Sequence, residues 1–457
     1  MADTSTPTTI EKTGISYPQD YSLETLTFVD SSGAKIELSQ MLIEFSYYED
    51  IYSFTTSGHM TIMDAGGVIE ALKLTGNEFL EIDFGKTKTA SNRTKKTFRV
   101  YKIGDRTPQG NQNSELYTLY FCSEELILSE QNKISKSYKG KNITSIIKDI
   151  LSNYLKISNN KIDTIEETLG TYDFLVPRLK PFEAISWLST YARPYKPAEG
   201  ADMLFFETKF GFNFRSLQSM FKDNVYATYK YQAKNLDDKS LPMEEKLLSV
   251  LEYEFNKPYD ILNEINSGSI ASRTISIDPL TRTYKVTDFD INKYKTQATL
   301  LNKNLPTNDL KNRLGKKSSE SSESVVKVVT STAGQQVVPY IKETDSATKD
   351  IFIETSVPNR TAQIALANYT SMKIAIPGDP GITAGRTINL NLLSLYQGNN
   401  RETDKLYSGK YLVTAVRHII SVPESYQTIL EICKDSSVNP LPEVNEASAN
   451  LQKDLKA

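Results

Sequence analysis

Two pairs of adjacent carboxylates are the residues whose types could support acid–base chemistry. They are Glu124 with Glu125, and Glu166 with Glu167. Hydrolysis of a glycosidic bond needs two carboxyl groups that converge across the scissile bond. Adjacent residues on a strand point to opposite faces, and on a helix they are separated by about 100°. We therefore expect both pairs to be solvated surface charges and not a catalytic pair.

Cysteine and histidine, the other candidates for catalysis or metal binding, occur twice each. Cys122 and Cys433 stand in apolar, strand-like runs, which is typical of small buried hydrophobes and not of redox sites. His59 and His418 have no other Cys or His at ligand spacing. We therefore expect no metal site and no histidine general base.

Short catalytic motifs are missing from the sequence. It contains no G-x-x-x-x-G-K-[ST] phosphate loop, no H-E-x-x-H, no G-x-S-x-G and no paired C-x-x-C. Gly66 and Gly67 are interpreted as a turn between strands, because the surrounding pattern of a dinucleotide site is missing. The sequence thus predicts no catalytic residue, no cofactor and no metal, so an enzyme is not expected.

A basic cluster precedes a predicted helix that starts at residue 143. It could contact phosphate or an acidic neighbouring protein, and a solvated loop is the alternative. Lys+Arg number 53 and Asp+Glu number 56, for a net charge of -3, which argues against nucleic acid as the main partner. We keep the cluster as a candidate partner-contact loop formed by Lys133, Lys136, Lys139 and Lys141.

The residues before about 128 favour an antiparallel barrel or sandwich. Residues 21–29 form a strand-like run that ends at the turn signal 30–33. Leu80, Ile82 and Phe84 alternate with Glu81 and Asp83, so one face of this strand is apolar and the other is wet. Residues 116–122 are mostly apolar and are expected to be more fully buried.

Helical periodicity begins after this region. Asn142 can cap a helix whose apolar stripe then follows at i, i+3, i+4 and i+7: Ile143, Ile146, Ile147, Ile150, Leu151, Tyr154 and Leu155. A second helix is predicted from Pro181 through Tyr191, and Pro194 stops it. Residues 129–240 are therefore predicted to form an α/β domain.

The last third of the chain returns to strands. Residues 316–334 begin as a Ser/Glu/Lys loop with a short strand inside it, and a helix is expected from 361 to about 369. A turn is predicted at 377–381, and the strand signals are 372–376, 388–392, 411–420 and 428–433. The tail from Asp435 is polar and is expected to be loose.

An internal repeat carries more weight than any short motif. Residues 44–58 match residues 254–268 at a constant offset of 210, with identities at Glu, Phe, Asp, Ile, Ser and Gly. Residues 74–84 share a turn and an alternating apolar pattern with residues 382–392, and residues 118–122 resemble 428–433. We interpret these matches as two copies of one barrel.

The domain organisation follows from this repeat. The predicted fold class is α+β and β-rich, with two barrels, the second split by an insertion, and an α/β domain between them. The predicted ranges are 1–17 flexible N-terminus, 18–128 first barrel, 129–240 α/β domain, 241–290 second barrel (first part), 291–359 insertion, 360–435 second barrel (second part) and 436–457 polar tail.

Length and hydropathy limit the cellular setting. A chain of 457 residues is long enough for two to four domains. The polar start has no apolar stretch typical of a signal peptide, and no apolar run approaches the roughly 18 residues that cross a bilayer. We expect the chain to be made and folded in a cytoplasm.

The layout resembles the baseplate central hub family of contractile-tailed bacteriophages, which is related to the hub part of type VI secretion spike proteins. The similar elements are the helix entry at 136–147, the segment 181–188, the turn and strand at 377–388, and the closing strand at 409–416. The resemblance covers about residues 20–435, and it makes the two barrels similar to those of tail tubes. The insertion and the polar tail depart from the pattern.

The resemblance implies a structural protein of the virion tail baseplate, made in the host cytoplasm. It implies a homotrimer whose six barrels adapt the sixfold tail tube to a threefold, membrane-piercing spike. The implied partners are the tail tube protein, the spike protein and other baseplate (wedge) proteins. DNA would pass through the lumen without specific binding, and Glu81 and Asp83 are candidate channel-lining residues.

Two other functions remain open on the sequence. The chain could be the hub of a related contractile injection or secretion machine. It could also be a tail-associated peptidoglycan hydrolase, which is the least favoured of the three functions because the sequence lacks catalytic motifs.

Overall fold

The computed structural model describes most of the chain. The described residues are 17–30, 32–67, 76–87, 92–110, 114–195, 202–231, 241–257, 260–279, 282–296, 298–305, 316–330, 353–367, 369–394, 403–404, 406–422 and 425–439. The predicted tails therefore lie outside the described residues at 1–16 and 440–457, and so do 306–315 and 331–352 of the predicted insertion.

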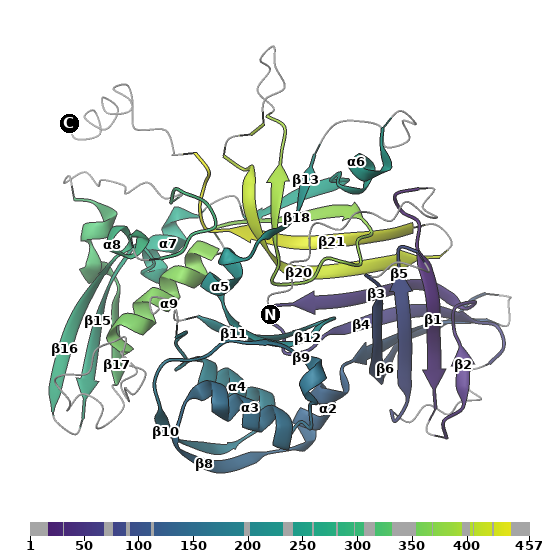
Figure 1. Cartoon of the computed structure of the whole chain (residues 1–457), viewed down its shortest axis with the longest axis horizontal. Coiled ribbons are helices and arrows are strands. Elements are labelled where there is room, and N and C mark those ends of the chain that lie inside the picture. The colour runs from purple at the N-terminus through teal and green to yellow at the C-terminus, as the bar shows by residue number, and fades with distance from the viewer. Residues whose placement is uncertain are drawn as a thin grey trace.

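One sheet of thirteen strands dominates the described part of the chain (Figure 1). Its first half contains β1 (Ser22–Val29), β2 (Lys35–Glu37), β3 (Leu42–Asp50), β4 (Ser57–Asp64), β5 (Phe79–Gly85), β6 (Thr94–Pro108) and β7 (Glu115–Cys122). Its second half contains β13 (Val225–Lys230), β14 (Glu252–Lys257), β18 (Thr370–Pro377), β19 (Thr387–Asn391), β20 (Gly409–Ser421) and β21 (Ser425–Lys434).

The two halves repeat one strand order. Neighbouring strands run β3-β4-β7-β6-β5-β1 in the first half and β14-β18-β21-β20-β19-β13 in the second. The corresponding strands also follow one another in the same order along the chain. The β1–β5 pair is antiparallel and the β13–β19 pair is parallel, while the other corresponding pairs are antiparallel in both halves. The β-rich α+β fold class is confirmed, and closure of each half into a barrel stays a prediction.

The registers show which residues correspond. Phe79, Arg99 and Cys122 lie side by side across β5, β6 and β7. Thr387, Leu412 and Cys433 lie side by side across β19, β20 and β21. The offset between Phe79 and Thr387 is 308, the same as between the predicted segments 74–84 and 382–392. That part of the predicted repeat is confirmed for the described residues.

The offset of 210 is wrong by two residues. Phe45 pairs with Met60, which pairs with Leu119, and the corresponding row of the second half is Tyr253, Ile374 and Leu430. Phe45 therefore corresponds to Tyr253, at an offset of 208. A shift of two residues keeps each side chain on the same face of the strand, which explains why the pattern still matched.

The match of Ser57 and Gly58 to Ser267 and Gly268 has no counterpart in the structure. Gly58 lies inside β4, where an added Cβ would stand 2.3 Å from the carbonyl oxygen of Ser46. Gly268 instead ends helix α7 (Ile261–Ser267) in the left-handed conformation, with φ of 74°. The two glycines therefore serve different purposes, a close strand contact and a helix end.

The two halves meet at one seam. β3 pairs antiparallel with β20, from Asp50 opposite Ala415 to Glu44 opposite Ser421. The core of the first half includes Ile420 from β20, and the core of the second half includes Ile51 from the first half. Because each hydrophobic core includes a side chain from the other half, the two halves pack as one unit.

An α/β region lies beside the large sheet (Figure 1). Asn142 caps α3 by accepting a 2.9 Å hydrogen bond from the Ser145 amide, and α4 begins at Pro181, as predicted. The isoleucines of the predicted stripe are buried. Its elements are α2 (Glu124–Gln131), β8 (Ile134–Lys141), α3 (Ile143–Asn153), β9 (Ile162–Ile165), β10 (Tyr172–Leu179), α4 (Pro181–Ser189), β11 (Met203–Thr208), β12 (Gly211–Ser216) and α5 (Leu217–Lys222).

A second, three-stranded sheet corrects the predicted ranges. Residues 241–290 were predicted as part of the second barrel, but of their strands only β14 joins the large sheet. β15 pairs with β16 and β17. This sheet and its helices lie between β14 and β18 in the chain: β15 (Ala271–Asp278), β16 (Thr283–Asp290), β17 (Val326–Thr330), α8 (Ile291–Lys295) and α9 (Ile353–Ala367). A short helix, α6 (Met243–Leu247), precedes β14.

None of the helices in the described ranges combines the length and the apolar content that crossing a membrane requires.

His418 makes the seam sensitive to pH. Its buried Nδ1 lies 2.9 Å from the Tyr426 hydroxyl, and burial lowers the pKa of its ring to about 3. An unfolded histidine has a pKa of about 6.5, so between about pH 6.5 and about pH 3 only the unfolded chain takes up this proton. The contribution of His418 to stability is therefore lost as the pH falls through this window.

We expect His418→Asn, which keeps a hydrogen-bonding group but cannot titrate, to be less stable than the wild type at pH 7. Between pH 6.5 and pH 5 it should lose about 2 kcal/mol less unfolding free energy than the wild type. Urea unfolding at the two pH values measures the difference. His59→Asn is the control, because His59 is only partly buried. Equal pH dependence in wild type and His418→Asn would contradict the assignment.

Candidate functional site

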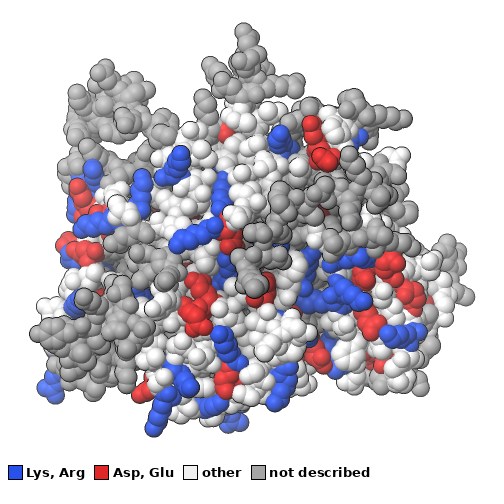
Figure 2. Space-filling model, in the orientation of Figure 1, with Lys and Arg blue, Asp and Glu red and all other residues white. Residues whose placement is uncertain are grey.

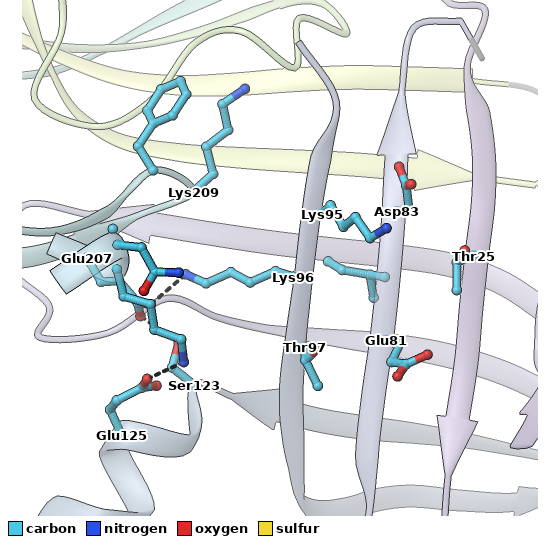
Figure 3. Close-up of a pocket in the computed structure, with 15 residues that line it drawn as sticks. Thr25, Glu81, Asp83, Lys95, Lys96, Thr97, Ser123, Glu125, Glu207 and Lys209 are labelled. Carbon is cyan, nitrogen blue, oxygen red and sulfur yellow. Dashed lines mark hydrogen bonds and ion pairs between the residues drawn. The ribbon is translucent and has the colours of Figure 1, made fainter. Parts of the chain in front are cut away.

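A pocket of ≈ 550 Å³ lies between β5 and β6 of the large sheet and the β11–β12 hairpin of the α/β region (Figure 3). Its walls carry charged side chains of both signs. Their ability to bind a ligand depends on whether they are already paired within the chain. The charged lining residues are Lys95, Lys96, Lys161, Lys209, Glu81, Asp83, Glu125 and Glu207.

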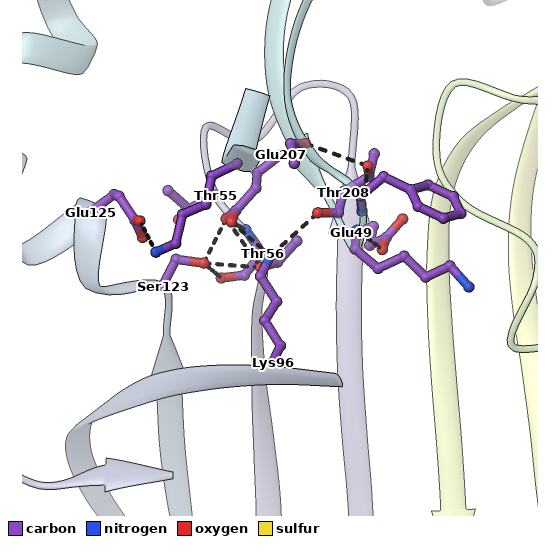
Figure 4. A network of polar contacts seen from close by, with 12 residues as sticks. Glu49, Thr55, Thr56, Lys96, Ser123, Glu125, Glu207 and Thr208 are labelled. Atoms are coloured by element: carbon purple, nitrogen blue, oxygen red, sulfur yellow. Dashed lines mark hydrogen bonds and ion pairs between the residues drawn. The ribbon is translucent and has the colours of Figure 1, made fainter. Parts of the chain in front are cut away.

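Glu207 at the end of β11 is the centre of this site (Figure 4). Its buried carboxylate accepts hydrogen bonds from the Thr56 amide at 2.9 Å and from the Ser123 hydroxyl at 2.5 Å. Lys96 of β6 forms an ion pair with it at 2.6 Å. One side chain of the α/β region is therefore bonded to three separate places in the first half of the sheet.

Glu49 on β3 forms a second junction. Its carboxylate accepts hydrogen bonds from the Tyr47 hydroxyl at 2.8 Å, the Lys209 amide at 2.7 Å and the Ala384 amide at 3.1 Å. Burial raises its pKa, and these hydrogen bonds partly oppose the rise. Glu49 thus connects the first half of the sheet, the β11–β12 turn and the turn before β19.

Lys209 lies in the β11–β12 turn, and its side chain extends toward the second half of the sheet. Its ammonium group donates to the carbonyl of Pro380, and burial lowers its pKa to about 8. The neighbouring Asp379 accepts hydrogen bonds from the hydroxyls of Tyr226 at 3.1 Å and Tyr229 at 3.0 Å, and from the Gly381 amide. The turn predicted at 377–381 is therefore the point where β13, the hairpin and the second half of the sheet are joined.

The adjacent carboxylates do not converge, as expected, but they are not all surface charges. Glu124 pairs with Arg99 at 3.0 Å, whereas Glu125 is buried and pairs with Lys161 at 2.7 Å. Glu166 accepts hydrogen bonds from Ser216, and Glu167 pairs with Lys148. The prediction of solvated charges was wrong for Glu125, because α2 turns that side chain toward the α/β region.

Glu81 and Asp83, the candidate channel-lining residues, lie on β5 and line the pocket (Figure 3). Glu81 pairs with Lys35 at 2.9 Å, and Asp83 pairs with Arg93 at 2.6 Å. Both therefore have a positively charged neighbour within the same chain. Their assignment to a channel wall stays a prediction.

The candidate partner-contact lysines lie on a strand and not on a loop. Lys136, Lys139 and Lys141 belong to β8, which pairs with β10, and Lys133 directly precedes it. Lys136 forms an ion pair with Asp149 at 2.7 Å, while the other three side chains are exposed. This segment forms a strand and not a loop because Ile134 and Tyr138, which lie on the same face of β8, are buried. The intervening lysines and serines obscure this pattern in the sequence.

The two cysteines are buried, as the sequence indicated, and the two histidines lie on strands β4 and β20. Cys122 and Cys433 are buried free thiols, and burial raises the pKa of Cys122 to about 11. Burial also lowers the pKa of His59, whose Nδ1 lies 3.1 Å from the Tyr48 hydroxyl. Across the described ranges, no group of three His, Cys, Asp or Glu side chains is arranged to hold a metal ion.

Charges elsewhere on the molecule are also mixed. Figure 2 shows Lys and Arg interspersed with Asp and Glu over the visible face. In the pocket, Lys96 and Lys161 are each paired with a carboxylate, and Glu81 and Asp83 are each paired with a cation. Of these four ion pairs, the one between Lys96 and Glu207 joins the α/β region to the first half of the sheet.

The sequence did not single out Glu207, Glu49 or Thr56. None of these three residues belongs to a recognisable sequence motif. Their hydrogen-bond partners lie far away in the chain, as when the Thr56 amide donates to Glu207. A weak signal was present for Glu49, a carboxylate two residues after Tyr47 within the repeated segment 44–58.

No protein-family model matches the chain. The chain is 26% identical over 396 residues to a probable baseplate hub protein of Vibrio phage KVP40. The match covers 84% of this chain and 87% of that protein.

Two solved structures share the fold. A 43 kDa tail protein of prophage MuSo2 from Shewanella oneidensis has a TM-score of 0.53 at 8% identity, over 90% of this chain and 99% of that chain. A tail protein from Neisseria meningitidis MC58 has a TM-score of 0.51 at 11% identity, over 91% of this chain and 97% of that chain. The match to the probable baseplate hub protein of the Vibrio phage confirms the resemblance that the sequence indicated, and the two structures show a similar fold.

Glu207→Ala should destabilise the protein by about 3 kcal/mol, because it leaves Lys96 without its ion pair and the Thr56 and Ser123 donors without their acceptor. Glu167→Ala is the control. Glu167 pairs with Lys148 on the surface, where both side chains are more than half exposed (58% and 51%). Its loss should change stability by less than about 0.5 kcal/mol. Urea unfolding of both variants measures the two effects, and equal losses would exclude a junction role for Glu207.

Proposed function

We propose that this chain is a structural baseplate hub protein of a phage tail. The match to a probable baseplate hub protein carries this proposal, because it extends over 84% of this chain and 87% of the relative. The site favours the same conclusion, since its buried charges bond chain segments to one another. A structural role fits side chains that are already paired.

The active form in this proposal is a homotrimer. The repeated strand order gives each chain two half-sheets of similar construction. Three chains would supply six such half-sheets, which can face a sixfold ring on one side and a threefold partner on the other. The hub would then adapt the sixfold tail tube to a threefold, membrane-piercing spike.

The partners of the proposed hub are the tail tube protein, the spike protein and other baseplate (wedge) proteins. The trimer would surround part of the genome ejection channel, and DNA would pass through it without specific binding. A net charge of -3 supports this, because a strongly basic lumen would hold phosphate and slow transit. The chain would be made in the host cytoplasm and reside in the virion tail baseplate.

The exposed lysines of β8 are a proposed contact with an acidic neighbouring baseplate protein. Lys133, Lys139 and Lys141 are exposed, and the adjacent β10 presents the exposed Leu175 (65%). Charges next to an exposed apolar side chain are typical of the rim of a protein interface.

Light scattering of the purified chain, alone and mixed with the spike and tail tube proteins, tests the trimer. We expect a species of three times the 51.4 kDa chain mass, at least in the mixture, and threefold symmetry of the hub in electron micrographs of the assembled particle. A chain that remains monomeric in both samples would overturn the trimer. Hydrolysis of purified peptidoglycan would contradict a purely structural role.

Charge reversal tests the β8 contact. Lys133→Glu, Lys139→Glu and Lys141→Glu in one chain should weaken incorporation into baseplates at least about tenfold, because like charges would then face the acidic partner. The control reverses three exposed lysines elsewhere, Lys222, Lys230 and Lys303. Incorporation measured by pull-down should be unchanged in the control. Equal behaviour of the two triple variants would exclude this contact.

A further inference from the structure

Helix α9 covers one face of the three-stranded sheet formed by β15, β16 and β17 (Figure 1). Lys285 of β16 stands opposite Ser276 of β15 and forms an ion pair with Glu354 of α9 at 2.7 Å. The covered face is therefore the one that Ser276 shares with the other side chains at every second position of β15. These side chains are polar and fully buried: Ser272, Thr274, Ser276 and Asp278.

The opposite face of this sheet is apolar and open. Ile275 of β15 stands between Val286 of β16 and Val328 of β17 in the register, and Ile277 stands beside Tyr284. These side chains therefore form one patch, which we call the outward face. The exposed fractions on it are large for apolar groups: Tyr284 (72%), Val328 (63%), Val326 (49%), Val286 (47%) and Ile277 (38%).

This arrangement reverses the usual order of a sheet with one covered face. Where a helix covers one face, the apolar side chains normally point toward the helix and the polar ones toward water. Contiguous apolar patches are uncommon on the open surface of soluble proteins, and a large one marks a place where another segment or molecule docks. The outward face therefore needs an occupant.

The described chain ends beside this sheet. Ser437 and Asn304 exchange two backbone hydrogen bonds, of 3.0 and 2.7 Å. The residue after Asn304, Leu305, belongs to a core cluster with Phe289 near the end of β16 and Ile291 at the start of α8. The residues that follow Asn439 therefore continue from the end of the sheet at which β16 finishes.

The sequence after Asn439 has the pattern of an amphipathic helix. Apolar residues recur at i, i+3, i+7 and i+11, which places them on one helical face: Val444, Ala447, Leu451 and Leu455. Pro442 precedes them, where a helix start tolerates proline. Charged and amide residues take most of the other positions: Glu443, Asn445, Glu446, Asn450, Gln452, Lys453, Asp454 and Lys456.

The length of this segment suits the sheet. A helix over 443–456 would be about 21 Å long. The eight residues of β15 span about 26 Å. The short connection at 440–442 would bring the helix to the end of the sheet where the described chain stops. Four apolar side chains on one side of such a helix match the row of apolar side chains along the outward face.

We propose that residues 443–456 pack as an amphipathic helix on the outward face of the same copy, opposite α9. The sheet then lies between two helices, and its apolar side chains are removed from water. β17 and the C-terminal segment both lie in regions that depart from the layout of phage baseplate hub proteins, so the contact belongs to this chain and is independent of the proposed trimer.

Hydrogen–deuterium exchange of the whole purified chain tests this contact. The amides of 443–456 should exchange at least about tenfold more slowly than unprotected amides, because a docked helix keeps its hydrogen bonds. Val286→Ser with Val328→Ser should return them to unprotected rates, since the two serines remove apolar contacts and leave the sheet backbone unchanged. Leu175→Ser with Val225→Ser is the control. These side chains are 65% and 37% exposed elsewhere on the molecule, and their loss should leave the protection unchanged.

Three results of this measurement would overturn the proposal. The first is a segment 443–456 that exchanges at unprotected rates in the wild type. The second is protection that persists in the Val286→Ser, Val328→Ser chain. The third is protection that disappears when the chain is diluted about tenfold or that develops only after other baseplate proteins are added, because the occupant would then be another copy or another protein.

Dye binding gives a second measurement that leaves the sheet itself unaltered. Leu451→Ser with Leu455→Ser should uncover the outward face and raise the fluorescence of a dye that binds exposed apolar surface at least about twofold. Lys453→Ser, on the polar side of the predicted helix, is the control and should not change the fluorescence. Equal dye binding by the wild type and the Leu451→Ser, Leu455→Ser chain would also overturn the proposal.

Discussion

The edge of a β-sheet must be covered, and the β3–β20 seam meets this constraint inside the chain. Unpaired backbone groups along a strand recruit a partner strand, so joining the halves edge to edge removes one open edge from each. The seam also places Ile420 in the core of the first half and Ile51 in that of the second. The thirteen-stranded sheet, its two cores and the position of the α/β region all depend on this contact.

Buried charges then lock the α/β region against both halves. Burying a carboxylate is costly unless hydrogen bonds or an ion pair replace its hydration. Glu207 has hydrogen bonds and one ion pair, and Glu49 accepts three hydrogen bonds. Because these partners come from distant segments, the groups are satisfied only when all segments are in place. The pocket beside them therefore reflects how the parts are held together, and most of its charged side chains are bonded within the chain.

The duplication gives the fold its relation to assembly. One strand order appears twice, and each half has a long strand, β6 or β20, whose second part extends beyond its neighbour. In the second half, β3 covers that extension of β20. The duplication therefore supplies both the repeated strand order and the edge at which the two halves are joined.

The local elements and much of the repeat could be predicted from the amino-acid pattern. Period-two alternation placed β5, the stripe after Asn142 placed α3, and the offset of 308 between 74–84 and 382–392 matches the register of β5 and β19. Three features depend on contacts between distant segments: the separation of β15 and β16 from the large sheet, the strand β8, and the junction formed by Glu207, Glu49 and Thr56. They could not be predicted because periodicity reports only which face of an element is buried. It carries no information about which distant segment supplies the partner, and that choice is made by strand pairing and by the need to satisfy buried charges.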